Sequence, residues 1–365
     1  MARFDKEHEA RRSQAAIDRI RGLLGEERLT VADRISMIYA EYIPLTRDEL
    51  LHNALKAMVN SVATPITGKP DKRRIVAVCG NSGAGKTTAV IKHLQSLKAT
   101  ASYIDEDGVE IHPLICIECP SPCTPKLMAL TGLKAFGIAP SANMKENEAW
   151  EEFRRLVKVH KVMWIFIDEA QHAIETATLR EATVIGNSLK GLTQMSDWPV
   201  RLVMAGVPPL ALFLARKQLY NRRTVVPFEP VSISDDDDLI GTLLATVATK
   251  HGGLKIDIDL QDREKAFRER LSHSCEAEFG SIIQMIRGAV EVALLAGRDF
   301  VSLQDFVDTY ASFSGCRPNR NIFTASNWQD LEPSLALLRD EDRAWEDARL
   351  RAKGKNATKY GVRPQ

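Results

Sequence analysis

The sequence predicts an α/β fold in which helices flank a parallel sheet, with a helical segment before it and a helical unit after it. Two observations predict it. Four short apolar runs alternate with helix-like stretches between residues 74 and 206, as is typical of parallel strands buried on both faces. A glycine-rich turn joins the first run to the first helical stretch, which is the arrangement of a phosphate-binding loop.

The chain begins with a predicted N-terminal helical region, residues 1–65. Apolar residues recur there at helical spacing, and Thr46 begins the pattern T-R-D-E ahead of an apolar stretch, which predicts a capping box and a helix. The segment 61–74 is rich in turn-forming residues and ends in three basic residues, so it predicts a linker.

Residues 66–230 form the predicted core. Strands are expected at its unbroken apolar runs, 75–80, 113–118, 162–168 and 200–206. Helices are expected between them at 87–98, 125–136, 146–160 and 180–194. The sheet is expected to end near Pro227–Pro230.

Residues 231–316 are expected to form an all-helical lid. Ser232 and Ser234 precede an acidic run that suits the start of a helix, and 261–273, 279–296 and 302–312 are helix-like as well. The remaining residues, 317–365, form a polar C-terminal tail. Its last part, 349–365, carries six basic residues and no acidic one.

The charges are almost balanced, with 49 Lys and Arg against 48 Asp and Glu in 365 residues, a formal net charge of +1. This balance argues against a wholly basic DNA-coating protein, and a hydrophobic content of 44% argues against a disordered chain. A local basic patch stays possible. Because there is no apolar run of about 18 residues and no signal-peptide pattern, we expect a cytoplasmic protein with no membrane partner.

Three cysteines, Cys116, Cys119 and Cys123, follow His112 closely. They could ligate a metal ion, but tetrahedral zinc sites usually show a second ligand pair at recognisable spacing, and none follows. The interpretation we favour places Cys116 in a buried strand and the other two in a proline-rich loop.

The strongest motif fits G-x-x-x-x-G-K-[ST] at every fixed position, between an apolar strand and a helix. Its glycines let backbone N–H groups wrap round a phosphate at a helix N-terminus. Lys86 is expected to reach the β- and γ-phosphates, and the Thr87 hydroxyl to ligate Mg²⁺. The residues expected to bind nucleotide are Gly80, Asn81, Ser82, Gly83, Ala84, Gly85, Lys86, Thr87 and Thr88.

A second motif is the apolar run that ends in Asp168 and Glu169. A carboxylate at the tip of a buried strand is costly unless it meets a cation or a hydrogen bond. Asp168 is expected to be the further Mg²⁺ partner, and Glu169 to polarise the attacking water as a general base. No guanine-reading Asn-Lys-x-Asp motif occurs, so ATP is favoured over GTP.

Hydrolysis needs further positive charge, for which the sequence offers three arginines. Arg222 and Arg223 could supply an arginine finger to a neighbouring subunit, or could be a surface pair at a helix end. Arg287 could sense the γ-phosphate or be a solvated helix residue, and we favour the second interpretation.

Together these features resemble the AAA+ ATPases, with a P-loop sheet and a helical lid, and more closely the TniB/TnsC group of transposition regulators, relatives of MuB and IstB. The resemblance covers roughly residues 30–330. Besides the phosphate loop it rests on Ile167–His172, the strand end Ala205–Pro208, an arginine before Pro-Phe-x-Pro, Tyr42-Ile43-Pro44, Leu50 to Val59, Asn321-Ile322-Phe323 and Trp328.

The resemblance implies a DNA-binding ATPase that regulates transposition. Such proteins form ATP-dependent rings or helical filaments on double-stranded DNA, recruit or stimulate an integrase-type transposase, and are reset by ATP hydrolysis. Partners implied for this chain are therefore duplex DNA, further copies of itself, the transposase and, as an option, a target-selection protein. The same resemblance assigns the finger in trans to Arg222.

The sequence departs from the family at one strand end. AAA+ sensor strands usually end in Asn, Thr or Ser, whereas this one ends in Ala205-Gly206-Val207. We therefore expect hydrolysis that is slow or depends on DNA or a partner. Candidate DNA contacts are Lys126, Lys145, Arg180, Lys190 and the basic stretch 349–365, although each is also a plausible solvated charge.

Two other classes remain open. A secretion or signalling ATPase could carry a similar I-D-E-A-Q box, but no appended membrane or peptidoglycan-binding segment is visible. A helicase or replication loader is the other, and no clear zinc finger or winged-helix unit supports it.

Overall fold

The computed structural model describes residues 14–63, 74–141, 143–175, 178–195, 197–215, 217–232, 239–260, 266–339 and 342. They divide into two compact units. The sheet unit comprises the described parts of 1–30, 40–230 and 278–280, and the helical unit those of 31–39, 231–277 and 281–365. Within the described residues, no helix is both long and apolar enough to span a membrane.

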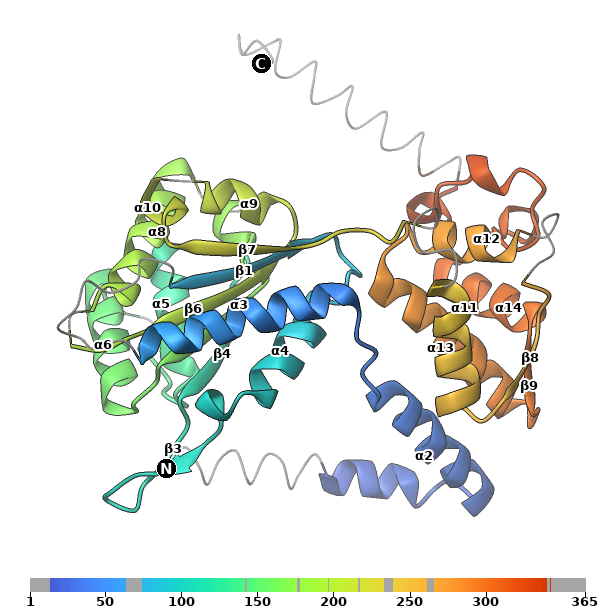
Figure 1. Ribbon diagram of the computed structural model, residues 1–365, viewed down its shortest axis with the longest axis horizontal. Helices are drawn as coiled ribbons and strands as arrows, with labels where there is room; N and C mark the ends of the chain where they lie inside the picture. The colour runs from blue at the N-terminus through green and yellow to red at the C-terminus, as the bar shows by residue number, and fades with distance from the viewer. Residues whose placement is uncertain are drawn as a thin grey trace, which may run out of the picture. The chain divides into compact units, whose positions relative to one another are not determined.

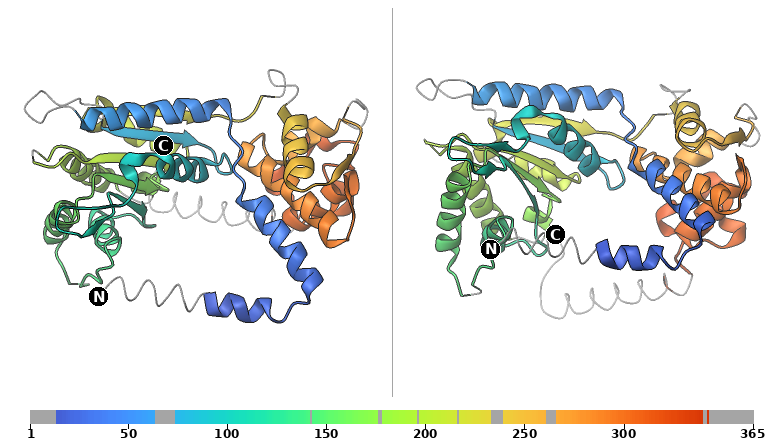
Figure 2. Two further views of the ribbon diagram at one scale, coloured as in Figure 1. Left: turned by 60° about the horizontal axis from the view of Figure 1, so that its bottom comes forward. Right: turned by 90° about the horizontal axis from the view of Figure 1, so that it is seen from below.

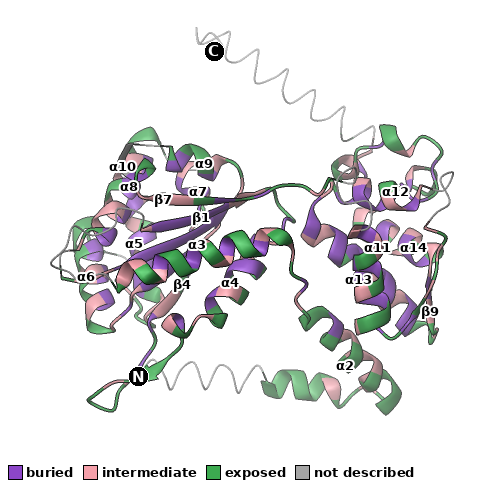
Figure 3. Cartoon of the chain, in the orientation of Figure 1, coloured by how far each residue is buried: buried purple, intermediate pink, exposed green. Residues whose placement is uncertain are grey.

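The sheet unit is built on five parallel strands in the order β4-β5-β6-β1-β7 (Figure 1). Each of the four predicted strands is confirmed to within two residues at its ends. They are β1 (Ile75–Gly80), β4 (Leu114–Glu118), β5 (Trp164–Asp168) and β6 (Arg201–Gly206). The buried residues of β1 are purple in Figure 3, as expected for a strand with neighbours on both sides.

Sequence reasoning missed the fifth strand, β7 (Arg223–Phe228). It lies at the edge of the sheet beside β1, so its exposure alternates and it tolerates Pro227, which a central strand would not. Its last residue, Phe228, pairs with Gly80, and a Cβ on Gly80 would lie 2.3 Å from the Phe228 carbonyl oxygen. Only glycine fits at this position.

The other edge strand, β4, is also less buried than its apolar sequence suggests. Its exposure pattern is mixed, and Cys116 is exposed, so the prediction of a strand buried on both faces was wrong for β4. The physical reason is its place at the edge, where one flank has no neighbouring strand.

Helices cover both faces of the sheet. Two of them pack on one face with the side chains of Val76, Val78, Phe166 and Val203 and bury a common core. These are α3 (Thr46–Val62), the blue helix along the sheet in Figure 2, and α4 (Lys86–Ser96). The other face holds α5 (Pro125–Lys134), α6 (Glu146–Val159), α8 (Leu179–Thr193) and α9 (Pro209–Leu214).

Short elements complete the sheet unit: η1 (Lys98–Thr100), β2 (Tyr103–Ile104), β3 (Glu110–Ile111), α7 (His172–Glu175) and α10 (Lys217–Tyr220). The predicted helices at 87–98, 125–136, 146–160 and 180–194 correspond to α4, α5, α6 and α8, and are confirmed.

The start of α3 differs from the predicted capping box. The helix begins at Thr46, so the N-cap residue is Leu45, and the Asp48 carboxylate accepts a hydrogen bond from the Leu45 N–H at 2.7 Å. Asp48 also accepts hydrogen bonds from the Tyr42 hydroxyl and, at 2.9 Å, from His93 Nε2. A buried carboxylate with three partners thus fixes the helix start, rather than the Thr46 hydroxyl.

The helical unit contains part of α2 (Glu26–Ala40), then α11 (Leu239–Leu244), the π-helix η2 (Ala245–His251), α12 (Phe267–Ser274), most of α13 (Phe279–Leu295) and α14 (Leu303–Ser314). It is not all-helical as predicted, because β8 (Lys255–Asp257) pairs in parallel with β9 (Phe300–Ser302). Three-residue strands leave too little pattern for detection from sequence.

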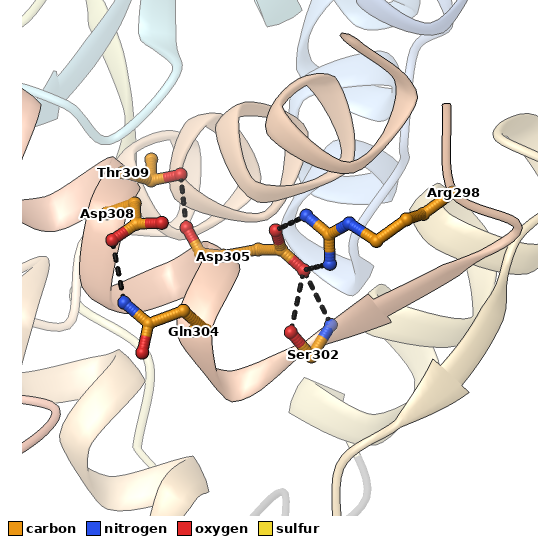
Figure 4. Close-up of polar contacts among 6 residues, drawn as sticks. All are labelled: Arg298, Ser302, Gln304, Asp305, Asp308 and Thr309. Carbon is orange, nitrogen blue, oxygen red and sulfur yellow. Dashed lines mark hydrogen bonds and ion pairs between the residues drawn. The ribbon is translucent and has the colours of Figure 1, made fainter. Parts of the chain in front are cut away.

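A buried ion pair stabilises the start of α14 (Figure 4). The Asp305 carboxylate, 1% exposed, pairs with both terminal nitrogens of Arg298 and accepts hydrogen bonds from the Ser302 N–H and hydroxyl at 2.8 and 2.9 Å. Burial alone would raise the pKa of Asp305, but these hydrogen bonds outweigh it and lower the pKa below its usual value.

The first part of the predicted tail packs into the helical unit. It forms the short helices η3 (Pro318–Arg320), η4 (Trp328–Asp330) and η5 (Pro333–Leu335). Phe323 packs against Phe267 and Phe306, and Arg270 donates to the Ala325 carbonyl at 2.9 Å. The basic stretch 349–365 lies outside the described residues.

Candidate nucleotide-binding site

The phosphate loop (Gly80–Thr87) connects the carboxyl end of β1 to the N-terminus of α4. Gly83 and Gly85 have φ angles of +79° and +86°, in the left-handed region that favours glycine. The turn leads directly into the first N–H groups of α4, which have no partners within the helix and carry the positive end of its dipole. Such a terminus is suited to bind an anion.

Lys86 is the first residue of α4 and is 8% exposed. Its ammonium donates to the Asn81 carbonyl at 2.7 Å, so the side chain folds back across the loop. Burial lowers the pKa of Lys86, and the nearby carboxylates of Glu169, Asp168 and Glu278 oppose that shift. A desolvated cation therefore lies within the loop.

Thr87 and Asp168 meet although they are 81 residues apart in the chain. The Thr87 hydroxyl donates to Asp168 Oδ2 at 2.8 Å, and Asp168 Oδ1 accepts from the Glu169 N–H at 2.9 Å. A hydroxyl and a carboxylate oxygen at this spacing suit Mg²⁺, which prefers oxygen ligands and keeps several waters. The residues present therefore fit the predicted metal ion.

Glu169 follows β5 in a tight turn, with a φ angle of +51°. Glutamate rarely adopts this left-handed conformation, and such strain gathers at functional sites. The turn is held on the sheet by a 2.9 Å hydrogen bond from the Ala170 N–H to the Ala205 carbonyl at the end of β6.

Gln171 is the polar residue that sequence reasoning missed at this turn. Its side-chain NH₂ donates to Glu169 Oε2 at 2.5 Å, and its Oε1 accepts from the Val207 N–H at 3.2 Å. Gln171 is 3% exposed. The end of β6 carries no polar side chain, as predicted, but a buried amide from the neighbouring strand's turn occupies that place.

Two further contacts hold the phosphate loop within the sheet unit. The Asn81 side-chain amide donates to Glu278 Oε1 at 2.8 Å, and Arg47 donates to the Ala84 carbonyl. The Arg47 guanidinium also lies 4.1 Å from the centre of the Phe228 ring. Neither Arg47 nor Glu278 belongs to a nucleotide-binding motif, so the sequence offered no signal for their contacts with the loop.

The predicted arginines lie apart from this loop. Arg222 directly precedes β7, and Arg223 pairs with Ile75, so both lie at the amino end of β1, roughly 16 Å along the strand from Gly80. The Arg223 guanidinium lies 4.8 Å from the centre of the Tyr220 ring. The backbone of both residues therefore lies at the opposite end of β1 from the phosphate loop.

Arg287 is buried, so the interpretation as a solvated helix residue was wrong. Its guanidinium lies 5.5 Å from the centre of the Tyr39 ring in the helical unit. Tyr39 in turn donates to Glu291 Oε2 at 2.8 Å. Arg287 is part of the packing of α13 against α2.

The candidate DNA contacts are scattered over the surface helices. Lys126 is half-buried in the first turn of α5, Arg180 is exposed in the first turn of α8, and Lys190 is half-buried at the far end of α8. Lys145 precedes α6 and forms a 4.0 Å ion pair with Glu148. Lys126 and Arg180 are thus at corresponding ends of two helices that contact one another.

The cysteines do not form a metal site. Cys119 and Cys123 are buried with their sulfur atoms 3.6 Å apart, whereas Cys116 is exposed on β4. Among the described residues, no group of three or more His, Cys, Asp or Glu side chains could hold a metal ion.

Comparison with known proteins agrees with this geometry. Residues 69–214 match the family described as AAA domain. The search of curated proteins gives no significant match to this sequence.

Two solved structures are similar in fold. The Orc1 protein of Aeropyrum pernix in complex with DNA has 16% sequence identity and a TM-score of 0.55, over 77% of this chain and 69% of that chain. Cdc6p from Pyrobaculum aerophilum has 14% identity and a TM-score of 0.53, over 76% and 70%. The five-stranded parallel sheet, its flanking helices and these likenesses show that the chain has the AAA+ fold.

Proposed function

We propose that this chain is an ATPase that binds ATP with Mg²⁺ at the phosphate loop and hydrolyses it to ADP and phosphate. The observation that carries the proposal is the meeting of the Thr87 hydroxyl with Asp168 beside the buried ammonium of Lys86. The match of residues 69–214 to the AAA domain supports it.

Each residue of the site has a definite task in this reaction. The loop N–H groups of residues 80–88 cradle the phosphates, and Lys86 neutralises charge on the β- and γ-phosphates. Thr87 and Asp168 would hold the magnesium ion, which supplies electrostatic stabilisation of the transferred phosphoryl group. Glu169 orients and deprotonates the attacking water. Arg222 acts as a finger on the site of a neighbouring subunit.

Nucleotide binding and phosphate release test this proposal directly. We expect a fluorescent ATP analogue to bind with magnesium, and phosphate release to depend on duplex DNA or on assembly, because the finger comes from another subunit. A purified, folded protein that binds neither ATP nor ADP would refute the assignment of the loop.

We further propose that the ATPase acts on duplex DNA as a regulator of transposition, forming a ring or helical filament that recruits an integrase-type transposase and, with it, a target-selection protein. The resemblance of residues 30–330 to the TniB/TnsC group supports this proposal. Two of its motif positions are structural: Asn321 donates to the Val307 carbonyl at 2.9 Å, and Phe323 is buried.

Replication initiation is the second candidate, because the similar solved structures are an Orc1 protein in complex with DNA and a Cdc6 protein. Electron microscopy with duplex DNA and a non-hydrolysable ATP analogue separates the candidates. Continuous ATP-dependent filaments or closed rings on DNA of any sequence support the transposition regulator. One or two subunits bound only at a specific duplex site support an initiator.

Binding of DNA phosphates by Lys126 and Arg180 would make the affinity strongly dependent on salt. Replacing either residue by alanine should weaken binding to all duplex sequences alike and reduce the salt slope by about one for each phosphate that is no longer neutralised. Lys92→Ala is the matched control because Lys92 is an exposed lysine on α4 and is not one of the candidate DNA contacts.

A further inference from the structure

We propose that Gln171 is a positioning residue that ties Glu169 to the end of strand β6, in place of the polar side chain that this strand lacks. The inference rests on the proposed ATP hydrolysis and names a residue that controls it. The two polar ends of the Gln171 side chain bond to Glu169 and to the Val207 backbone, so it acts through Glu169.

The Gln171 side-chain amide makes one hydrogen bond as a donor and another as an acceptor. The NH₂ group donates to Glu169 Oε2 at 2.5 Å, and the carbonyl oxygen accepts from the Val207 N–H at 3.2 Å. The amide therefore bridges a carboxylate at the end of β5 and a backbone group just beyond the end of β6. A displacement of either strand end is transmitted to the Glu169 carboxylate.

Gly206 makes this bridge possible. A Cβ at position 206 would lie 2.6 Å from Gln171 Oε1 and 3.2 Å from the Gln171 backbone nitrogen. Real Cβ atoms are not found at the first distance, so any side chain larger than hydrogen would displace the amide. The absence of a polar residue at the end of β6 and the presence of Gln171 are thus two parts of one arrangement.

The residue type is specified by its surroundings. Gln171 is buried, so each of its polar atoms needs a partner, and a neutral amide offers one donor side and one acceptor side. Leucine would leave the Val207 N–H without its partner, and glutamate would put a second carboxylate against Glu169. Asparagine is one methylene shorter and cannot span both partners.

The bridge matters for hydrolysis because Glu169 lies in a strained turn. Its φ angle is +51°, its backbone N–H donates to Asp168 Oδ1 at 2.9 Å, and the Gln171 amide donates to its carboxylate Oε2. A general base contributes only when its oxygen is within hydrogen-bond reach of the water it deprotonates. Without the amide, the carboxylate would sample other rotamers.

The test compares Gln171→Ala with wild type by steady-state ATP hydrolysis on duplex DNA and by titration with a fluorescent ATP analogue. We expect kcat to fall at least tenfold while the dissociation constant of the analogue changes less than twofold. His172→Ala is the matched control: it is the next residue in the same box, but its ring faces Glu175 at 3.2 Å, so kcat should stay within twofold.

Gly206→Ala supplies an independent arm that leaves Gln171 in place. It should lower kcat as Gln171→Ala does, again with nucleotide affinity retained. The double variant should be little slower than Gln171→Ala alone. The 2.6 Å contact with the amide is then gone, and the contacts that remain, with Leu210 at 3.1 Å and the Gln171 backbone nitrogen at 3.2 Å, need shifts of only a few tenths of an ångström. This non-additivity separates a positioning role from two unrelated losses of packing.

The outcomes are distinct. If the wild-type protein hydrolyses ATP and the kcat of Gln171→Ala is equal or higher, this inference alone is overturned. The amide would then have no effect on Glu169 or would restrain it. If Gln171→Ala does not fold, an unchanged kcat in Gly206→Ala overturns it equally. No turnover in the wild-type protein, with DNA and after assembly, overturns the proposed function and this inference together.

Discussion

The Thr87 hydroxyl lies 2.8 Å from Asp168 Oδ2, so the first turn of α4 and the end of β5 meet at one point. The strand before the phosphate loop and the strand that ends in Asp168 are separated by β6 in the sheet, because the order is β5-β6-β1. This skip places the acidic turn opposite the phosphate loop. The two oxygens are therefore preorganised by the topology of the sheet.

Lys86→Ala should abolish nucleotide-dependent assembly. Removing the buried ammonium costs about 2 kcal/mol of phosphate binding, which corresponds to roughly a thirtyfold higher dissociation constant for ATP. Titration with a fluorescent ATP analogue measures the change. Lys92→Ala, an exposed lysine on the same helix, serves as the control and should bind like wild type.

Glu169→Gln should retain ATP binding and trap the assembled state on DNA. Loss of the general base lowers the hydrolysis rate by about 10²–10⁴-fold. Glu118→Gln is the matched control because Glu118 is exposed at the end of β4, beside Asp168 in the register. If Glu169→Gln hydrolyses ATP at the wild-type rate, the assignment of the base is wrong.

Arg222→Ala should lower hydrolysis without weakening ATP binding, because the residue serves a neighbour's site. Mixing this variant with Glu169→Gln should restore part of the lost activity, since the second protein supplies intact fingers to intact sites of the first. Phosphate release measured across mixing ratios checks the prediction. If the activity of each mixture equals the sum of the activities of the two proteins measured separately, Arg222 does not act in trans.

Asp305→Asn should destabilise the helical unit at neutral pH by about 2–4 kcal/mol, because it leaves the Arg298 charge without its carboxylate. The folded-state pKa of Asp305 is lowered, so its stabilisation is complete above the unfolded value, about 3.9, and is lost as pH falls through the folded value. Urea unfolding should therefore give different free energies of unfolding for wild type and variant at pH 7. The two values should converge in acid.

The control for that experiment is Asp308→Asn on the same helix. Asp308 accepts a 2.7 Å hydrogen bond from the Gln304 side chain at an exposed position (Figure 4). A surface substitution of this kind should change stability by no more than about 0.5 kcal/mol at either pH.

Gly132→Ala should destabilise the sheet unit although alanine is the better helix former. A Cβ on Gly132 would lie 2.7 Å from the Phe153 ring, where α5 packs on α6, and overpacking costs about 1–3 kcal/mol. Gly186→Ala in α8 should instead stabilise by about 0.5–1 kcal/mol, because its nearest neighbour, Phe213, is 3.8 Å away. Thermal unfolding of both variants tests the contrast.

Much of the sheet could be predicted because three of its strands, β1, β5 and β6, have neighbours on both sides and therefore read as unbroken apolar runs. β7 was missed for the opposite reason: as an edge strand it alternates in exposure and contains Pro227. The paired β8 and β9 are too short to leave a pattern in the sequence.

The candidate site likewise has one part that the sequence predicts and another that only the structure shows. The phosphate loop is a local motif whose spacing is visible in eight residues, and the acidic pair follows an apolar run. The role of Gln171 depends on Val207, 36 residues away, and on the absence of a side chain at Gly206, so it emerges only from the pairing of β5 with β6. Arg287 was misjudged because its partner, Tyr39, belongs to a distant helix.

The close approach of Gly80 to Phe228 bears on how the motif should be weighed in other sequences. The first glycine of the loop is required by the neighbouring strand whether or not a phosphate is bound. A descendant of this chain that lost ATP binding would therefore still keep that glycine, while Lys86 and Thr87 could be substituted. The lysine and the threonine, rather than the first glycine, are the positions that report a working nucleotide site.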